Sequence, residues 1–436
     1  MKPARSKFSL PYAYDIDDVA KVVDDVAEYT NQVFKDYIIP LSNELYSEYT
    51  RHKNAFALTQ KTLKKTGIID IGRLYAYKTS DNIFKKKTIL PKGKNHGIVL
   101  GIDNSASMRP VFHEVLANAA AIAHFCNRAK VKLKCFTFTG HTVYHNGTDP
   151  RGYNSVKGDI DTSIDSRVND LREIFNENMT LDTIRNIYYE ALLCISFGFD
   201  FYTPNNKKDN SKEDMLIKLG VFSNTEHAKE VIVRWHQQAT PLATANIAAL
   251  QLADEMKRSD VEHVSIVMLT DGDNNVGITD NSMRQLGDGH FHNNYCKSLS
   301  YKGETYNVSN FRFYNNPIFK EVRSKRSKFN GMCGIEAADN TLVFLVNEII
   351  HKNNFEIHQI NLGECKWLSD VYSQYLKSYK NTGIFHEKGI LGFTSVTCLD
   401  LEKKLENGQY QESLYRRNIR KFLAKQVVSY ICDTFK

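Results

Sequence analysis

Apolar runs that end abruptly in polar turns mark out the middle of this chain. Residues 97–102 and 264–269 are rich in Ile, Val and Leu, and each run has the length of a buried strand. Residues 111–128 carry apolar side chains at helical spacing, whereas residues 132–139 alternate between polar and apolar. This succession of strands and helices predicts an α/β fold built around a sheet.

The polar residues that follow the two apolar runs are the most informative in the chain. The first run leads into Asp103, Ser105 and Ser107, in a D-x-S-x-S order that precedes a helix. The second run ends in Thr270-Asp271-Gly272, and between the two runs Thr240-Pro241-Leu242 opens a helix rich in Ala and Leu. Because open α/β sheets bind ligands at the carboxyl ends of their strands, we predict one site from these groups.

Carboxylates and hydroxyls are hard oxygen ligands, which suit Mg²⁺ or Mn²⁺ rather than a soft metal. The three motifs, in this order, resemble the metal-ion-dependent adhesion site (MIDAS) of von Willebrand factor A (VWA) domains. The resemblance implies a doubly wound, mostly parallel sheet with helices on both faces. It also implies a metal site made by Asp103, Ser105, Ser107, Thr240 and Asp271. The two serines would ligate the ion directly, and the two aspartates would hold it directly or through water.

Other interpretations of these residues stay open. Ser105 or Ser107 could simply cap the following helix, although capping does not explain why two separate strands end in Asp. The family usually has Gly between the two serines, where this chain has Ala106, which disfavours a positive φ there. Thr244 rivals Thr240 as the threonine ligand. We favour Thr240 because Pro241 suits the first helical turn and would leave Thr240 at the N-cap.

A narrower resemblance rests on three segments. Residues 72–75 and 169–173, together with the long insert ahead of Thr240, resemble the VWA region of the cobaltochelatase T subunit. The segment KTSDNIFKKK, residues 78–87, resembles phage-encoded relatives of that subunit. A composition low in Gly and rich in Lys, Asn and Tyr also fits a gene from an AT-rich genome, such as that of a large phage.

The chain divides into three parts. Residues 1–94 are expected to be mostly helical and basic, residues 95–400 to form the VWA domain, and residues 401–436 to form a C-terminal helix. The central part exceeds a simple VWA domain, and the surplus falls into two inserts. The first, at about 145–235, is expected to be helical from about Asn169 to Trp235, and the second, at about 280–334, looks loop-like. Such inserts commonly carry recognition.

The segment 51–94 is strongly basic, with twelve Lys and Arg against two Asp and no Glu, a net charge of +10. Such a run is either a solvated face or a contact for an anionic partner. An acidic protein surface is the expected partner, because the chain has no RNA- or DNA-binding signature that would support nucleic acid.

Several classes of protein are not expected. No run of about 18 apolar residues predicts a membrane span, and the first residues lack the apolar core of a secretion signal. The eight scattered cysteines indicate reduced thiols in a cytosol, which is the host's if a phage encodes the chain. P-loop, H-E-x-x-H and G-x-S-x-G motifs are missing. His290, His292 and Cys296 have possible zinc spacing, but exposed loop residues are the default interpretation.

These observations favour a non-catalytic adaptor. Two carboxylates and three hydroxyls leave a divalent ion incompletely coordinated, so that an Asp or Glu of a partner could complete the shell. By the family resemblance that partner would be an AAA+ ATPase of the cobaltochelatase S or MoxR type. The alternatives are a structural protein of a virion and a metal-dependent hydrolase or peptidase, for which no general base or nucleophile is evident.

Overall fold

The structure is a computed structural model, and it describes most of residues 15–140 and 169–270 but only parts of the remainder. The described residues are 15–59, 62–76, 78, 84–89, 95–105, 108–109, 111–140, 169–199, 207–237, 240, 242–259, 261–270, 284–285, 291–292, 298–302, 304–307, 343, 346–347, 349–350, 352–362, 392–395, 423–425, 427–430 and 432.

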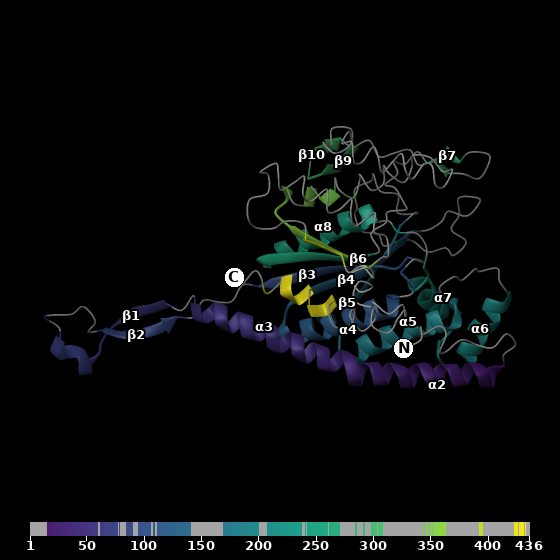
Figure 1. The fold of residues 1–436 in the computed structure, drawn as a ribbon, viewed down its shortest axis with the longest axis horizontal. Coiled ribbons are helices and arrows are strands. Elements are labelled where there is room, and N and C mark those ends of the chain that lie inside the picture. Colours follow the sequence, from purple (N-terminus) through teal and green to yellow (C-terminus); the bar gives the residue numbers. More distant parts are fainter. Residues whose placement is uncertain are drawn as a thin grey trace, which may run out of the picture.

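A six-stranded sheet with the order β12-β11-β6-β3-β4-β5 forms the centre of the molecule (Figure 1). Its strands are β3 (His96–Asp103), β4 (Lys132–Gly140), β5 (Asn169–Asn176), β6 (His263–Thr270), β11 (Glu356–Asn361) and β12 (Gly392–Ser395). Every neighbouring pair is parallel except β4 and β5, which are antiparallel. The mixed α/β fold with a mostly parallel sheet, as predicted from the sequence, is therefore confirmed.

Helices cover both faces of this sheet. On one face lie α4 (Phe112–Ala129), α5 (Leu181–Phe197) and the amino-terminal helices, and on the other lies α8 (Leu242–Arg258). The described residues between Val343 and Lys352 are also helical and contribute to the core on the α8 side. Alternate residues of β3 enter opposite cores, with Ile98, Leu100 and Ile102 on the α4 side and Val99 on the α8 side. All eight residues of β3 are buried, which explains its almost continuous apolar sequence.

The amino-terminal region is a long helical rod that ends in a hairpin. The helix α2 (Ile16–Val33) begins with a capping box at Asp15 and continues through a π-helical turn, Phe34–Ile38, into α3 (Ile39–Thr59). Pro40 explains the turn, because it has no N–H to donate to the carbonyl four residues earlier. Beyond α3, strands β1 (Thr62–Ile69) and β2 (Phe84–Ile89) form a separate antiparallel sheet, joined in part by the 3₁₀ helix η2 (Ile71–Ala76).

Helices make up most of the described part of residues 1–94, and the hairpin follows α3. One expectation about the first insert needs correction. The first insert does not begin with a helix, because Asn169–Asn176 is the edge strand β5. The composition of its sequence, NDLREIFN, favours a helix. Among residues 171–176, Ile174 and Phe175 are buried and the other four are at least partly exposed, as expected of an edge strand. Pairing with β4 therefore overrides the local preference.

The remaining elements lie in the inserts and near the carboxyl terminus. They are α6 (Lys207–Lys218), α7 (Thr225–Arg234) and two small hairpins, β7 (Arg284–Gln285) with β8 (Phe291–His292) and β9 (Ser298–Tyr301) with β10 (Glu304–Asn307). The described residues between Leu423 and Cys432 are helical and mostly buried, and the rest of 401–436 lies outside the description. No described helix is both long enough and apolar enough to cross a membrane. The described cysteines, Cys126, Cys135, Cys194 and Cys432, are buried.

Candidate functional site

Asp103, the last residue of β3, is wholly buried at the carboxyl edge of the sheet. Its Oδ1 accepts a hydrogen bond from the backbone N–H of Ser105, at 2.9 Å, and its Oδ2 accepts one from the Thr270 hydroxyl, at 2.7 Å. Since Thr270 ends β6, the carboxylate joins the ends of two neighbouring strands. A buried carboxylate is costly unless it is well paired, so its position at this edge indicates a specialised role.

The next residue, Asn104, fixes a distant part of the chain to the same edge. Its backbone N–H donates to the carbonyl of Phe138 on β4, at 2.9 Å. Its side-chain Nδ2 donates to the carbonyls of Arg234 and His236, at 3.5 and 3.2 Å. Asn104 therefore holds the segment that leads from α7 toward Thr240 beside the end of β3.

The direction of α8 places Thr240 at this edge as well. At the far end of the helix, Lys132 Nζ at the start of β4 donates to the carbonyl of Ser259, at 2.9 Å. A Cβ on Gly97, near the start of β3, would lie only 3.0 Å from Met256 Sδ. The last turn of α8 therefore lies at the amino edge of the sheet. The helix has 17 residues and spans about 25 Å, so that its first turn lies at the carboxyl edge.

Thr240 lies two residues before Leu242, where the described part of α8 begins. Thr244 lies within the helix, one turn further from the edge. Both threonines are wholly buried, and neither hydroxyl has a hydrogen-bond partner among the described residues. Burial alone does not separate the two candidates, but the direction of α8 favours Thr240.

Several other buried polar atoms near this edge have no hydrogen-bond partner within the described part of the chain. They are Asn104 Oδ1, Trp235 Nε1 and both amide atoms of Gln237. Buried polar groups are almost always hydrogen-bonded, and each exception calls for an explanation such as an ion or an ordered water. Gln237 directly follows the residue whose carbonyl Asn104 holds, and its side chain is only 1% exposed. Of these atoms, Asn104 Oδ1 and Gln237 Oε1 are neutral oxygens of the kind that a hard cation or an ordered water could contact, whereas Trp235 Nε1 and Gln237 Nε2 are N–H donors.

Three of the five residues predicted as metal ligands lie in the described part of the chain. Asp103 ends β3 and Ser105 follows it, the direction of α8 puts Thr240 toward the same edge, and Ser107 and Asp271 lie outside the described residues. No group of three or more His, Cys, Asp and Glu among the described residues could hold a metal. The predicted set has only two such residues and relies otherwise on hydroxyls. Of the possible zinc cluster only His292 is described.

Sequence reasoning missed three residues of this edge. Asn104 occupies a variable position of the D-x-S-x-S motif, and in the Thr270-Asp271-Gly272 motif only Asp271 is predicted as a ligand. Their tertiary contacts, with the α7–α8 connection and with Asp103, have no sequence signal beyond adjacency to the motif. Gln237 stands alone in a connecting segment and could not have been found at all.

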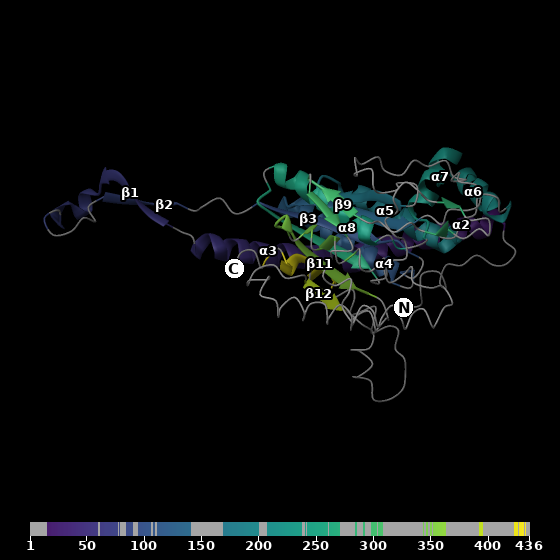
Figure 2. The same cartoon turned by 90° about the horizontal axis from the view of Figure 1, so that it is seen from above.

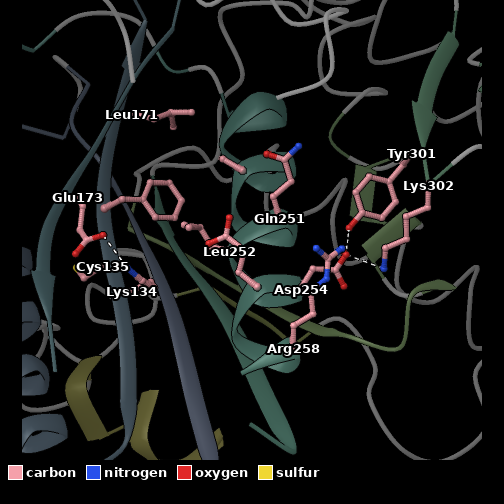
Figure 3. A pocket seen from close by; sticks show the side chains of 13 residues that line it. Lys134, Cys135, Leu171, Glu173, Gln251, Leu252, Asp254, Arg258, Tyr301 and Lys302 are labelled. Carbon is pink, nitrogen blue, oxygen red and sulfur yellow. Dashed lines mark hydrogen bonds and ion pairs between the residues drawn. The ribbon is translucent and has the colours of Figure 1, made fainter. Parts of the chain in front are cut away.

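A separate cavity of about 430 Å³ lies between α8, the strands β4 and β5, and the β9–β10 hairpin (Figure 3). Asp254 on α8 accepts a hydrogen bond from the Tyr301 hydroxyl and pairs with Lys302 Nζ at 2.6 Å. Lys134 and Glu173 form a second pair at 3.1 Å. Burial, followed by the hydrogen bond to Asp254, raises the pKa of Tyr301 above its ordinary value. Arg258, at the end of α8, also lines this cavity, which therefore lies toward the amino edge and away from Asp103.

No known protein family and no curated protein matches this chain. Among solved structures, the pilus adhesin SpaC of Lactobacillus rhamnosus GG in its open conformation is 9% identical with a TM-score of 0.33, and the match covers 78% of this chain and 30% of that one. A mutant of the PilB minor pilin of Streptococcus sanguinis is 10% identical with a TM-score of 0.36, covering 80% of this chain and 65% of that one. The chain spans less than two thirds of either protein, and similarity this low carries no functional argument.

Proposed function

We propose that this chain is a VWA-type adaptor that binds a partner protein through a metal ion at the carboxyl edge of its sheet. The proposal includes a doubly wound sheet. This part of the proposal is supported by the strand order, in which β3 lies between β6 and β4, and by helices on both faces of the sheet. In such sheets the strand order reverses beside the first strand, and ligands bind at that point. Asp103 ends β3, the strand at which the order reverses, and Ser105 follows it.

The observation that carries the proposal is a fully buried carboxylate, Asp103, at an edge where buried oxygen atoms lack partners among the described residues. In the proposal Ser105, Ser107 and Thr240 offer hydroxyls, and Asp103 and Asp271 offer negative charge. A bound Mg²⁺ or Mn²⁺ would supply a positive charge with room for one outside ligand. The hydrogen bond from Thr270 keeps the carboxylate of Asp103 oriented toward the edge before any ion binds.

The outside ligand in this proposal is a carboxylate of the partner, because an acidic side chain both suits a hard cation and compensates its charge. The resemblance to the cobaltochelatase T subunit suggests an AAA+ ATPase of the cobaltochelatase S or MoxR type. The chain itself would then be a non-catalytic subunit of an ATPase-dependent complex.

The test is a pull-down with an AAA+ ATPase of the cobaltochelatase S or MoxR type, at fixed low salt. We expect EDTA to release the ATPase, and excess Mg²⁺ to restore binding, without unfolding this chain. Asp103→Asn should abolish the metal-dependent binding. Asp254→Asn is a matched control, since it removes a carboxylate of α8 that pairs with Lys302 away from the edge. A complex that survives chelation unchanged would refute the adaptor mechanism.

A further inference from the structure

The β1–β2 hairpin carries most of the exposed apolar side chains. We call residues 62–89 the arm and residues 68–75 its tip. Among the described residues, five of the seven large apolar side chains that are exposed lie in the tip: Ile68, Ile69, Ile71, Leu74 and Tyr75. Ile71 is 84% exposed and Tyr75 is 87% exposed. Figures 1 and 2 show the arm extending well away from the body of the molecule.

The tip is an ordered turn. Asp70 Oδ1 accepts a hydrogen bond from the N–H of Gly72, at 3.2 Å, and the carbonyl of Asp70 accepts one from the N–H of Arg73, at 2.8 Å. Arg73 also lies 3.8 Å from the Asp70 carboxylate. These contacts satisfy polar groups within the turn and leave the apolar side chains outside. An isolated two-stranded hairpin is marginally stable in water, and a clustered apolar tip is typical of a binding surface.

The charge of the arm restricts what it can bind. It contains seven Lys and Arg and only two Asp, a net charge of +5, including the run Lys85-Lys86-Lys87. The favoured receptor is therefore an acidic surface with some exposed apolar side chains. The Asp70–Arg73 ion pair within the tip argues against insertion into a bilayer, where both charges would lose water.

The chain carries a surface of that kind at its other end. Residues 15–28, at the start of α2, contain six Asp and Glu and one Lys, a net charge of −5. Asp24, Asp25 and Glu28 are exposed, and Ile16, another of the exposed apolar side chains, lies in the first turn. Figures 1 and 2 place the start of α2 and the arm at opposite ends of the molecule, so that the arm cannot reach this surface within one chain.

We propose that the arm of one copy docks on the start of α2 of a second copy, so that the chain assembles head to tail. The interface joins two different surfaces, and the assembly therefore closes into a ring or continues as a filament. The basic arm and the acidic helix supply complementary charge, and the apolar tip supplies buried area around Ile16. This inference is independent of the metal site, since none of these residues lies at the carboxyl edge of the sheet.

Sedimentation velocity of the full chain tests the proposal, over about 1 to 100 µM protein. We expect the weight-average sedimentation coefficient to rise with concentration at about 50 mM NaCl and much less at about 500 mM, because salt screens exposed charges. The double variant Ile71→Ser/Tyr75→Ser should weaken self-association by at least about tenfold. Leu219→Ser, at an exposed apolar position outside both surfaces, should leave it unchanged. EDTA should have no effect, which separates this result from any failure of the metal proposal.

A charge exchange identifies the two surfaces. One variant reverses Lys85, Lys86 and Lys87 to Glu, and the other reverses Asp24, Asp25 and Glu28 to Lys. Each should be monomeric alone, whereas a mixture should associate again because each reversed surface meets its complement. Lys218→Glu/Lys229→Glu, at exposed positions elsewhere, is the charge control. Any one of three results would overturn the proposal. The wild type could stay monomeric at low salt, or the tip variant could leave self-association unchanged. The third such result is a monomer that instead binds anionic vesicles through the tip.

Discussion

Replacing Asp103 by Asn separates the metal role of this residue from its structural role. The carboxylate accepts hydrogen bonds from the Ser105 N–H and the Thr270 hydroxyl and is wholly buried. The amide has the same shape, and its oxygen can still accept from Ser105. Its NH₂ group would face Thr270, whose hydroxyl can rotate to accept the bond. Asp103→Asn should therefore change the free energy of unfolding without metal by no more than about 1 kcal/mol.

Asp103→Ala is the contrasting variant. It removes two hydrogen bonds to a charged group and leaves the Ser105 N–H and the Thr270 hydroxyl without this acceptor in a buried place. Hydrogen bonds to charged groups contribute about 1.5–3 kcal/mol each, and the relief of burying a charge offsets part of this, so we expect a loss of roughly 2–4 kcal/mol. The comparison of Asn with Ala thus measures what the carboxylate contributes to folding alone.

Magnesium then reveals the contribution of the negative charge. Binding to the folded state adds RT ln(1 + [L]/Kd), which is about 2.7 kcal/mol for the wild type at 100 times Kd. Asp103→Asn should show none of this gain. The assay is urea unfolding in EDTA and in increasing MgCl₂, supported by calorimetric titration with Mg²⁺ and Mn²⁺. If the Asn variant gains as much stability from Mg²⁺ as the wild type does, the assignment of Asp103 to the metal site is wrong.

Three further predictions concern neighbouring and buried polar groups. Thr240→Val should weaken Mg²⁺ binding at least about tenfold in calorimetry, and Thr244→Val should have little effect. The reason is that the direction of α8 puts only Thr240 at the edge. A larger loss of affinity in Thr244→Val would show that the assignment is wrong by one helical turn. Gln237→Leu should raise the metal-free stability by about 1 kcal/mol in urea unfolding, because it removes a buried amide without partners among the described residues. The same variant should lower the affinity for Mg²⁺. A loss of metal-free stability would indicate instead that the amide has hydrogen-bond partners. Burial raises the pKa of Glu190, and the guanidinium of Arg234, 3.0 Å away, offsets this rise only in part. The folded state therefore holds the proton more tightly than the unfolded state does. The free energy of unfolding should fall as the pH rises from the unfolded pKa of Glu190 through its raised folded pKa. Glu190→Gln should flatten this fall in urea unfolding between about pH 4 and 7, and an unchanged slope would contradict the assignment.

The sequence alone determined the elements whose environment is uniform along their length. The runs at 97–102 and 264–269 became β3 and β6, because a strand buried on both faces must be apolar at nearly every position. The segment 111–128 became α4, which is likewise buried over most of its length. The position of Asp103 at a strand end followed directly from where the apolar run stops.

Tertiary structure alone decided the features that depend on neighbours distant in sequence. The edge strand Asn169–Asn176 has a helix-like composition and is a strand only because β4 offers its free edge. The side chain of Asn104 donates to the carbonyl of His236, which is 132 residues away, and no local pattern encodes this contact. Gln237 directly follows His236, so the same contact determines where Gln237 lies. The arm and the acidic start of α2 are plain charge runs in sequence. The long helical segment of α2 and α3 lies between them, so that they are at opposite ends of the molecule and each surface is available only to another chain.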